Sequence, residues 1–167
     1  MREDRRTLVL ETRRIGIRLE ILTDQIMAQK GLSAAQGHIL LFILSRAREG
    51  TSLTEIHQEF GYSMASLSGI LKRLRKSGYV RVEPCLEDNR RKLLFCTEQA
   101  VELEQFLAHA ITATCDQAYQ GFSDGELAQL DRLQKKVMRN LSISADPQAK
   151  TRRSEHCEES PTTVEAV

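Results

Sequence analysis

Hydrophobic residues recur at intervals of three and four along most of this chain, which is the spacing of one face of a helix. In the first such segment, residues 5–29, the face consists of Leu8, Ile15, Leu19, Leu22 and Ile26. Similar faces follow at about 34–49, 53–60, 64–77, 98–119 and 124–143. The face of the second segment is Ile39, Leu40, Ile43, Leu44 and Ala47. These patterns predict a mainly α-helical chain.

Short polar signals mark where several of these helices begin. Ser33, Ser52 and Ser123 are each followed three residues later by Gln or Glu, which is the pattern of a capping box. Ser63 and Thr97 are predicted to be the N-cap residues of the helices that follow them.

A short alternating pattern interrupts the helices and predicts a small β-hairpin. Residues 79–82 alternate as a strand does, and residues 93–96 are the expected partner strand. The segment 84–91 between them is longer than a tight hairpin needs, so we expect it to project. The hairpin directly follows the two short helices 53–60 and 64–77. This order predicts a winged helix-turn-helix fold.

Basic side chains are concentrated in this region, although the net charge of the whole chain is only +1. Between residues 63 and 92 there are three acids and eight basic side chains, namely Lys72, Arg73, Arg75, Lys76, Arg81, Arg90, Arg91 and Lys92. A local basic patch, more than the overall balance, is the electrostatic signal of a nucleic-acid-binding surface.

The helix 64–77 is the candidate recognition helix. Its apolar residues lie on one face, which leaves small and hydroxylated residues outward in its first turns and basic residues outward later. Small side chains allow a helix to enter the ~12 Å major groove, while Lys and Arg contact phosphates. The residues predicted to contact DNA here are Ser63, Ala65, Ser66, Ser68, Gly69, Lys72 and Arg73. The alternative is a basic helix face that is simply solvated.

The projecting loop is the second candidate DNA contact. Arg90 and Arg91 lie near the predicted tip, where a guanidinium group can enter a narrow minor groove. Asp88 is expected to orient this segment by bonding to the arginine or to the loop backbone.

These residues together resemble the MarR (multiple antibiotic resistance regulator) family of winged-helix transcription factors. The resemblance covers about residues 5–143. It rests on Leu32 and Ser33 with Gln36, Ile39 and Leu40, on the helix pair, on Gly78 before Tyr79, and on Asp88 and Arg90 ahead of Thr97.

The resemblance implies an obligate homodimer, a palindromic DNA site and, often, a ligand or an oxidation that releases DNA. It places Ser66, Ser68, Lys72 and Arg73 on recognition-helix positions and Arg90 on the wing arginine. By the same resemblance, residues 1–143 form one domain, with a DNA-binding lobe at about 33–97 and dimerisation helices at about 5–29 and 98–143. The apolar faces of those terminal helices exceed what the lobe can cover, which independently favours a twofold dimer.

The chain departs from the family pattern at three places. Cys96 and Ala100 stand where the family usually has Leu and Gly after the wing. Gly69 stands where many members carry a polar or basic residue. The polar segment 144–167 has no counterpart and is predicted to be disordered.

Other classes of function find little support. No signal peptide or membrane span is expected, and cytosolic thiols are the simplest interpretation of four scattered cysteines. We expect no metal site, no cofactor and no enzymatic activity, because no ligand cluster, phosphate loop or nucleophile motif occurs. A redox role for Cys85 and a small-molecule effector near Arg14, Arg18 or His38 are left open. So is the rival function of a winged-helix protein-interaction module.

The sequence therefore predicts a cytoplasmic, homodimeric regulator of transcription that binds double-stranded DNA and acts as a repressor.

Overall fold

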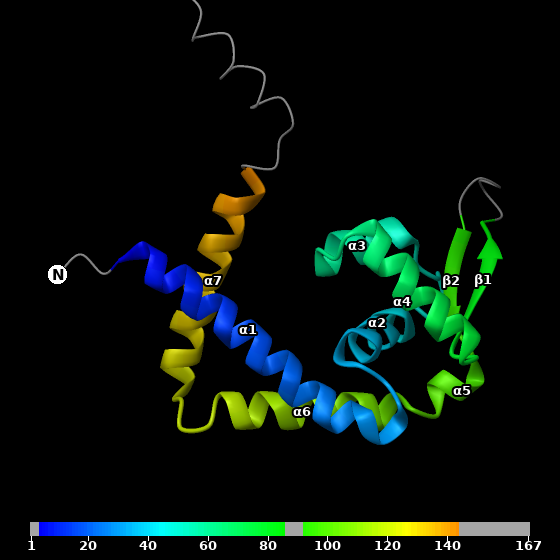
Figure 1. Cartoon of the computed structure of the whole chain (residues 1–167), viewed down its shortest axis with the longest axis horizontal. Coiled ribbons are helices and arrows are strands. Elements are labelled where there is room, and N and C mark those ends of the chain that lie inside the picture. Colours follow the sequence, from blue (N-terminus) through cyan, green and yellow to red (C-terminus); the bar gives the residue numbers. More distant parts are fainter. Residues whose placement is uncertain (1–3, 86–91, 144–167) are drawn as a thin grey trace, which may run out of the picture. The chain divides into compact units, whose positions relative to one another are not determined.

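The computed structural model describes residues 4–85 and 92–143, and these fall into two compact units that divide between Gln120 and Gly121. The first unit holds α1 (Arg5–Met27), the 3₁₀ turn η1 (Ala28–Lys30), α2 (Ala34–Ser45), α3 (Leu53–Phe60), α4 (Met64–Lys76), β1 (Val80–Pro84), β2 (Lys92–Cys96), α5 (Glu98–Val101) and α6 (Glu104–Ala118). The second unit holds α7 (Asp124–Ile143) (Figure 1). The predicted fold class, mainly helical with one β-hairpin in a winged helix-turn-helix, is confirmed.

The predicted capping boxes begin three of these helices. The backbone N–H of Ser33 donates to Gln36 Oε1 at 2.8 Å, and that of Ser52 donates to Glu55 Oε2 at 2.7 Å. At the start of α7, the N–H of Ser123 donates to Glu126 Oε2 at 2.9 Å. These bonds satisfy backbone donors that no helix carbonyl can reach, which fixes where each helix starts.

The hairpin pairs β1 and β2 antiparallel, with Val80 opposite Cys96 and Pro84 opposite Lys92. The first strand therefore begins one residue later than predicted. A third short segment joins this sheet, because Thr51 exchanges backbone hydrogen bonds with Leu94 at 3.1 and 2.7 Å. A bridge of one residue has no alternating pattern, so the sequence did not reveal it.

One core joins the lobe to the helices that flank it. Its fully buried side chains include Met27 of α1, Ile39 of α2, Ile56 of α3, Leu67 of α4 and Leu107 of α6. Within this unit α1 packs on α6 and on α2, and Figure 1 shows α2, α3 and α4 beside the hairpin. One side of α4 therefore packs on this core, and the opposite face of the helix is directed outward.

Two predictions about helix ends are wrong. Ala47 is exposed and lies beyond α2, because the backbone tightens after Ser45 into bonds from Arg46 and Ala47 to carbonyls three residues back. The expected helix 98–119 is split into α5 and α6. Thr97 makes no side-chain cap, because its hydroxyl donates to Gly78 O at 2.6 Å and ties the helix start to the turn before β1.

The terminal helices carry large apolar side chains that are exposed within the described residues. In α1 the exposed ones are Leu8, Val9, Leu10, Ile15, Ile17 and Ile21, and in α7 they are Leu133, Val137, Met138 and Leu141. None of the helices in residues 4–85 and 92–143 has the length and hydropathy needed to cross a membrane.

Candidate nucleic-acid interface and the adjoining cavity

The turn between α3 and α4 is tightly specified. Gly61 ends α3 with a φ of 69°, a left-handed conformation that favours glycine. His57 Nδ1 donates to the Tyr62 carbonyl at 2.6 Å, which bridges the turn. Ser63 then accepts from the backbone N–H of Ser66 at 3.1 Å and starts α4. The orientation of α4 is therefore fixed by bonds at its first residue.

The two faces of α4 divide as the sequence predicted. Leu67 and Leu74 are fully buried and Ile70 and Leu71 are nearly so. Most of the predicted DNA contacts on this helix are exposed, namely Ser63, Ala65, Ser66, Ser68, Lys72 and Arg73, and Gly69 is half-buried. The hydroxyl of Ser63 also donates to Ser66 Oγ at 2.9 Å, so Ser63 serves the helix start as well as the surface.

Gly69 lies on open space. A Cβ atom built at this position would meet no atom within 4 Å. Packing within the chain therefore does not require glycine there. Because Gly69 has no side chain, the surface of α4 is lower at this position, between the serines of its first turns and the basic residues that follow.

The wing is described only in its strands. Asp88, Arg90 and Arg91, the predicted wing residues, lie outside the described residues. Within the strands, Arg81 forms an ion pair with Glu83, and its guanidinium carbon lies 4.9 Å from the centre of the Phe95 ring. Arg81 therefore has partners within the hairpin. A count of basic residues along the sequence could not reveal these contacts.

The structure bears on the redox role that the sequence left open for Cys85. Cys85, the candidate sensor, is buried, whereas a reactive thiol needs access to solvent. Cys96 donates to the Leu40 carbonyl, and burial with a smaller contribution from Glu104 raises the pKa of its thiol to about 12. Cys115 is exposed. The burial of Cys85 and the raised pKa of Cys96 therefore argue against either as a sensor thiol.

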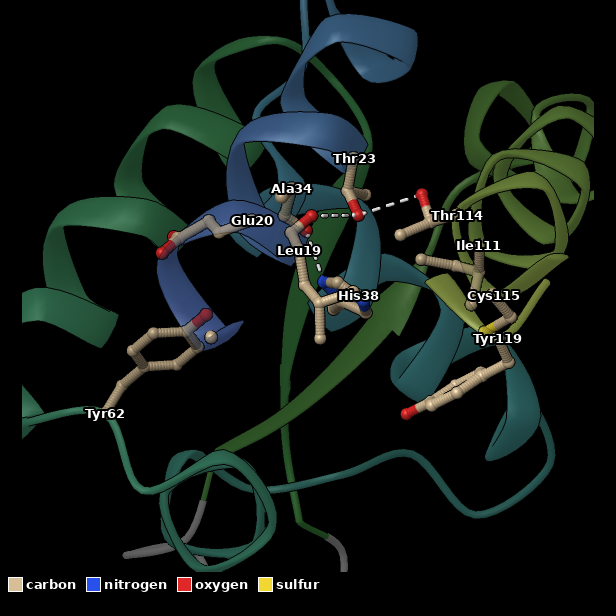
Figure 2. A pocket seen from close by; sticks show the side chains of 11 residues that line it. Leu19, Glu20, Thr23, Ala34, His38, Tyr62, Ile111, Thr114, Cys115 and Tyr119 are labelled. Atoms are coloured by element: carbon tan, nitrogen blue, oxygen red, sulfur yellow. Dashed lines mark hydrogen bonds between the residues drawn. The ribbon is translucent and has the colours of Figure 1, made fainter. Parts of the chain in front are cut away.

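A cavity of about 340 Å³ lies between the lobe and helices α1 and α6. Its wall consists of Gly16, Leu19, Glu20, Thr23, Ala34, His38, Tyr62, Ile111, Thr114, Cys115 and Tyr119. Figure 2 shows Glu20 and Tyr62 on one side, Ile111, Cys115 and Tyr119 on the other, and His38 between them. His38 borders the cavity as expected, whereas Arg14 and Arg18 do not line it.

The polar groups of this wall are held by bonds to the backbone. Thr23 Oγ1 donates to Leu19 O at 2.9 Å, and Thr114 Oγ1 donates to Ala110 O at 3.0 Å. The two hydroxyl oxygens lie 3.1 Å apart (Figure 2). His38 Nδ1 lies 2.8 Å from the Ala34 carbonyl, so that ring nitrogen carries the proton.

An aromatic cluster links the cavity to the helix-turn-helix. Tyr62 lines the cavity and stacks on Phe60 with ring centres 6.1 Å apart. Phe60 in turn contacts the rings of Phe42 and His38. Burial, with the carboxylates of Glu20 and Asp24, raises the pKa of the Tyr62 phenol. Tyr62 immediately precedes Ser63, so a cavity residue adjoins the first residue of α4.

Acidic, His and Cys side chains form no group of three that could hold a metal ion within the described part of the chain.

Comparison with known proteins gives a consistent result. Residues 30–91 match the model of the MarR family. Among solved structures, the transcriptional regulator SlyA superposes with a TM-score of 0.75 at 18% identity, covering 82% of this chain and 95% of SlyA. A mutant of E. coli MarR complexed with operator DNA gives 0.71 at 20% identity, covering 78% and 93%. The S. aureus MepR–DNA complex gives 0.73 at 18% identity, covering 79% and 96%.

Proposed function

Because residues 30–91 match the MarR family model and the chain shares the fold of MarR-family structures, we propose that it is a member of this family and a sequence-specific, DNA-binding regulator of transcription. The observation that carries the proposal is α4, a helix capped at Ser63 and buried along one side, with Ser66, Ser68, Lys72 and Arg73 outward. In this proposal the serines contact base edges, Lys72 and Arg73 contact phosphates, and Ala65 and Gly69 permit close approach. Arg90 and Arg91 of the wing contact the neighbouring minor groove or backbone, with Asp88 orienting them.

The regulator acts as a homodimer on a palindromic operator, from which it represses transcription in the cytoplasm without enzymatic activity. The exposed apolar faces of α1 and α7 support the dimer, since contiguous apolar surface on a protein commonly marks an interface. A twofold dimer would place two α4 helices about one turn of DNA apart, ~34 Å, which suits an inverted repeat.

Control of this binding is proposed to come from a small molecule in the cavity. A pocket of this volume falls in the range of small-ligand sites, ~300 Å³ and above. A ligand that displaces Tyr62 would disturb the stack on Phe60 and the bond from His57 to the Tyr62 carbonyl. Since Ser63 follows directly, α4 would change its orientation and the affinity for DNA would fall.

Salt dependence separates this function from a protein-interaction module that uses the same surface. DNA binding releases counterions from neutralised phosphates, so the association constant falls steeply as salt rises. We expect Lys72→Ala to weaken binding at low salt and to reduce the slope of log K against log salt by ~1. Fluorescence anisotropy with a labelled duplex measures both quantities.

Lys135→Ala is the matched control, because Lys135 is an exposed lysine of α7 that pairs with Asp131 and is not one of the residues proposed to contact DNA. It removes the same charge from the chain and should leave affinity and slope unchanged. Equal effects of the two substitutions, or a flat salt dependence of the wild type, would count against DNA binding through α4.

A further inference from the structure

The C-terminal part of α4 carries a cluster of exposed basic side chains, the α4 cations, namely Lys72, Arg73, Arg75 and Lys76. The helix itself contains no acidic residue. Among residues 4–85 and 92–143, ion pairs form within β1 and within α7, and neither includes an α4 cation. Like charges four residues apart on a helix repel each other, as those of Lys72 and Lys76 do. This surface therefore carries positive charge that no described carboxylate neutralises.

The sequence beyond α7 contains a segment of the opposite charge. Residues 155–165, the acidic segment, contain no Lys or Arg and carry four carboxylates, those of Glu155, Glu158, Glu159 and Glu165. The basic residues that follow α7 all precede this segment, at Lys150, Arg152 and Arg153. The acidic segment thus matches the α4 cations in number and is opposite to them in sign.

The acidic segment is connected to the folded chain by a tether that is long enough for it to fold back. Glu155 follows Ile143, the last residue of α7, by about twelve residues, and an extended chain of that length spans up to ~40 Å. The 20 residues of α7 extend over only ~30 Å. The segment can therefore return past Asp124, where α7 begins. A tethered segment reaches an effective concentration on the order of 1 mM at a site within its range.

We propose that the acidic segment occupies the outward face of α4 in the free protein and competes with DNA for it. This inference rests on the proposed role of α4 in DNA binding and adds an autoinhibitory contact to it. The carboxylates lie beside the α4 cations in place of DNA phosphates, so a duplex must displace them in order to bind. Because exposed ion pairs are individually weak, the contact lowers the affinity for DNA without abolishing it.

A second basic surface, on α7, is the competing location for the acidic segment. Arg132, Lys136 and Arg139 are exposed, recur at intervals of four and three, and belong to neither ion pair of the described residues. The α4 cations lie within residues 72–76, whereas these three are spread over residues 132–139. The higher density of positive charge favours α4 as the site.

Zero-length cross-linking of the full-length protein without DNA locates the acidic segment. A carbodiimide joins a carboxylate to an ammonium group that lies against it, and mass spectrometry of the linked peptides identifies both residues. We expect links from the acidic segment to Lys72 and Lys76, and their loss in ~0.5 M salt, which screens exposed ion pairs. Links only to Lys135 and Lys136 of α7, or no link to either helix, would overturn the proposal.

Neutralising the acidic segment should strengthen DNA binding. In the full-length chain, replacing all four of its glutamates by Gln should raise the affinity for a duplex about tenfold at low salt, the factor for four exposed ion pairs. The gain should shrink as salt rises, because the ion pairs that it removes are then already screened. Fluorescence anisotropy with a labelled duplex, measured over a salt series, gives both results.

A pair of double variants separates this contact from a general effect of net charge. Glu158→Gln with Glu159→Gln should raise the affinity about threefold, half of the full effect on a logarithmic scale. Glu102→Gln with Glu104→Gln removes the same charge from exposed positions at the junction of α5 and α6 and should leave the affinity unchanged. An equal gain in the two double variants, or wild-type affinity of the variant without all four glutamates, overturns the competition.

The two experiments also distinguish this inference from the proposed function. Failure of every form of the chain to bind a duplex would refute DNA binding through α4. The cross-links are formed without DNA, so they would still decide whether the acidic segment occupies that helix.

Discussion

The winged lobe and the terminal helices distribute apolar side chains in opposite ways. In the lobe, Ile39, Ile56, Leu67 and Leu74 are each 0% exposed. In α1 and α7 the exposed large apolar side chains range from 45% exposed at Ile17 to 70% at Val9. The lobe therefore buries its apolar side chains within one chain, whereas α1 and α7 leave apolar surface exposed, which is the surface proposed to pair two chains.

The free energy of burying apolar side chains shows why this difference between the two regions matters. Burying one large aliphatic side chain stabilises a protein by ~1.5–3 kcal/mol relative to leaving it exposed. Several half-exposed residues on each helix could thus contribute substantially to association. The lobe supplies the surface proposed to contact DNA, and the helices supply the surface proposed to place two lobes on one operator.

The largest expected effect comes from matched Leu→Ala substitutions in the two regions. Leu74→Ala leaves a cavity in the lobe and should lower the free energy of unfolding by ~3 kcal/mol at any protein concentration. Leu133 is 49% exposed, so Leu133→Ala should lower the stability less. Its effect should shrink at low protein concentration, where the dimer proposed to bury Leu133 dissociates. Urea denaturation at two concentrations measures both. Equal, concentration-independent losses would remove the distinction between the regions.

A charge on α7 should break the proposed dimer. Val137 is 55% exposed, and Val137→Asp places an unpaired carboxylate on the apolar face. We expect the mass from light scattering to fall from two chains to one while the helix content of the lobe is kept. Gln134→Asp introduces the same charge at an exposed polar position and should remain dimeric. A dimeric Val137→Asp would exclude this face of α7 from the interface.

A substitution in the wing should weaken DNA binding and leave the proposed dimer unchanged. Arg90→Ala should weaken operator binding by roughly tenfold, the loss of about one charged contact, with the dimer mass unchanged. Ser68→Ala is expected mainly to change which bases are preferred, because a hydroxyl can bond a base edge. Gel shifts with operator variants distinguish the two. Wild-type affinity of Arg90→Ala would argue against the wing as a DNA contact.

The smallest expected effect is on stability, and it comes from substitutions in equivalent capping boxes of the two regions. Bonds from the backbone and hydroxyl of Ser52 lower the pKa of Glu55, and those of Ser123 lower that of Glu126. A lowered folded-state pKa means that ionised Glu55 contributes stability above its unfolded value of 4.5, and that this contribution is lost as the pH falls through the folded value. Glu55→Gln should therefore be less stable than wild type at pH 7 and nearly equal to it at pH 3. Chemical denaturation at the two pH values checks this, and Glu126→Gln on the exposed start of α7 should change the stability less.

Local signals account for the parts of the fold that the sequence predicted. Ser33, Ser52 and Ser123 each combine with a residue three positions later, so the start of a helix is encoded within one turn. The face of α4 follows from leucine spacing alone. The missing side-chain cap at Thr97 was not anticipated because its hydroxyl bonds to Gly78, which lies 19 residues away.

The cavity could not be predicted for a similar reason. Its defining contact joins Thr23 to Thr114, two hydroxyls that are 91 residues apart and belong to no motif. Likewise, the ring contacts that connect His38, Phe60 and Tyr62 depend on how α2 packs against the turn after α3. The spacing of residues in the sequence identifies a candidate surface on a single helix. A pocket depends on how several helices pack together, which that spacing does not specify.

The central claim is that one lobe recognises half of an operator and the terminal helices pair two lobes. Selection of bound duplexes from a random library, followed by the mass of the selected complex, tests both parts together. The account predicts an enriched inverted repeat with half-site centres about one helical turn apart, ~34 Å, bound by two chains. Binding of a single chain, or the absence of any enriched sequence, would contradict it.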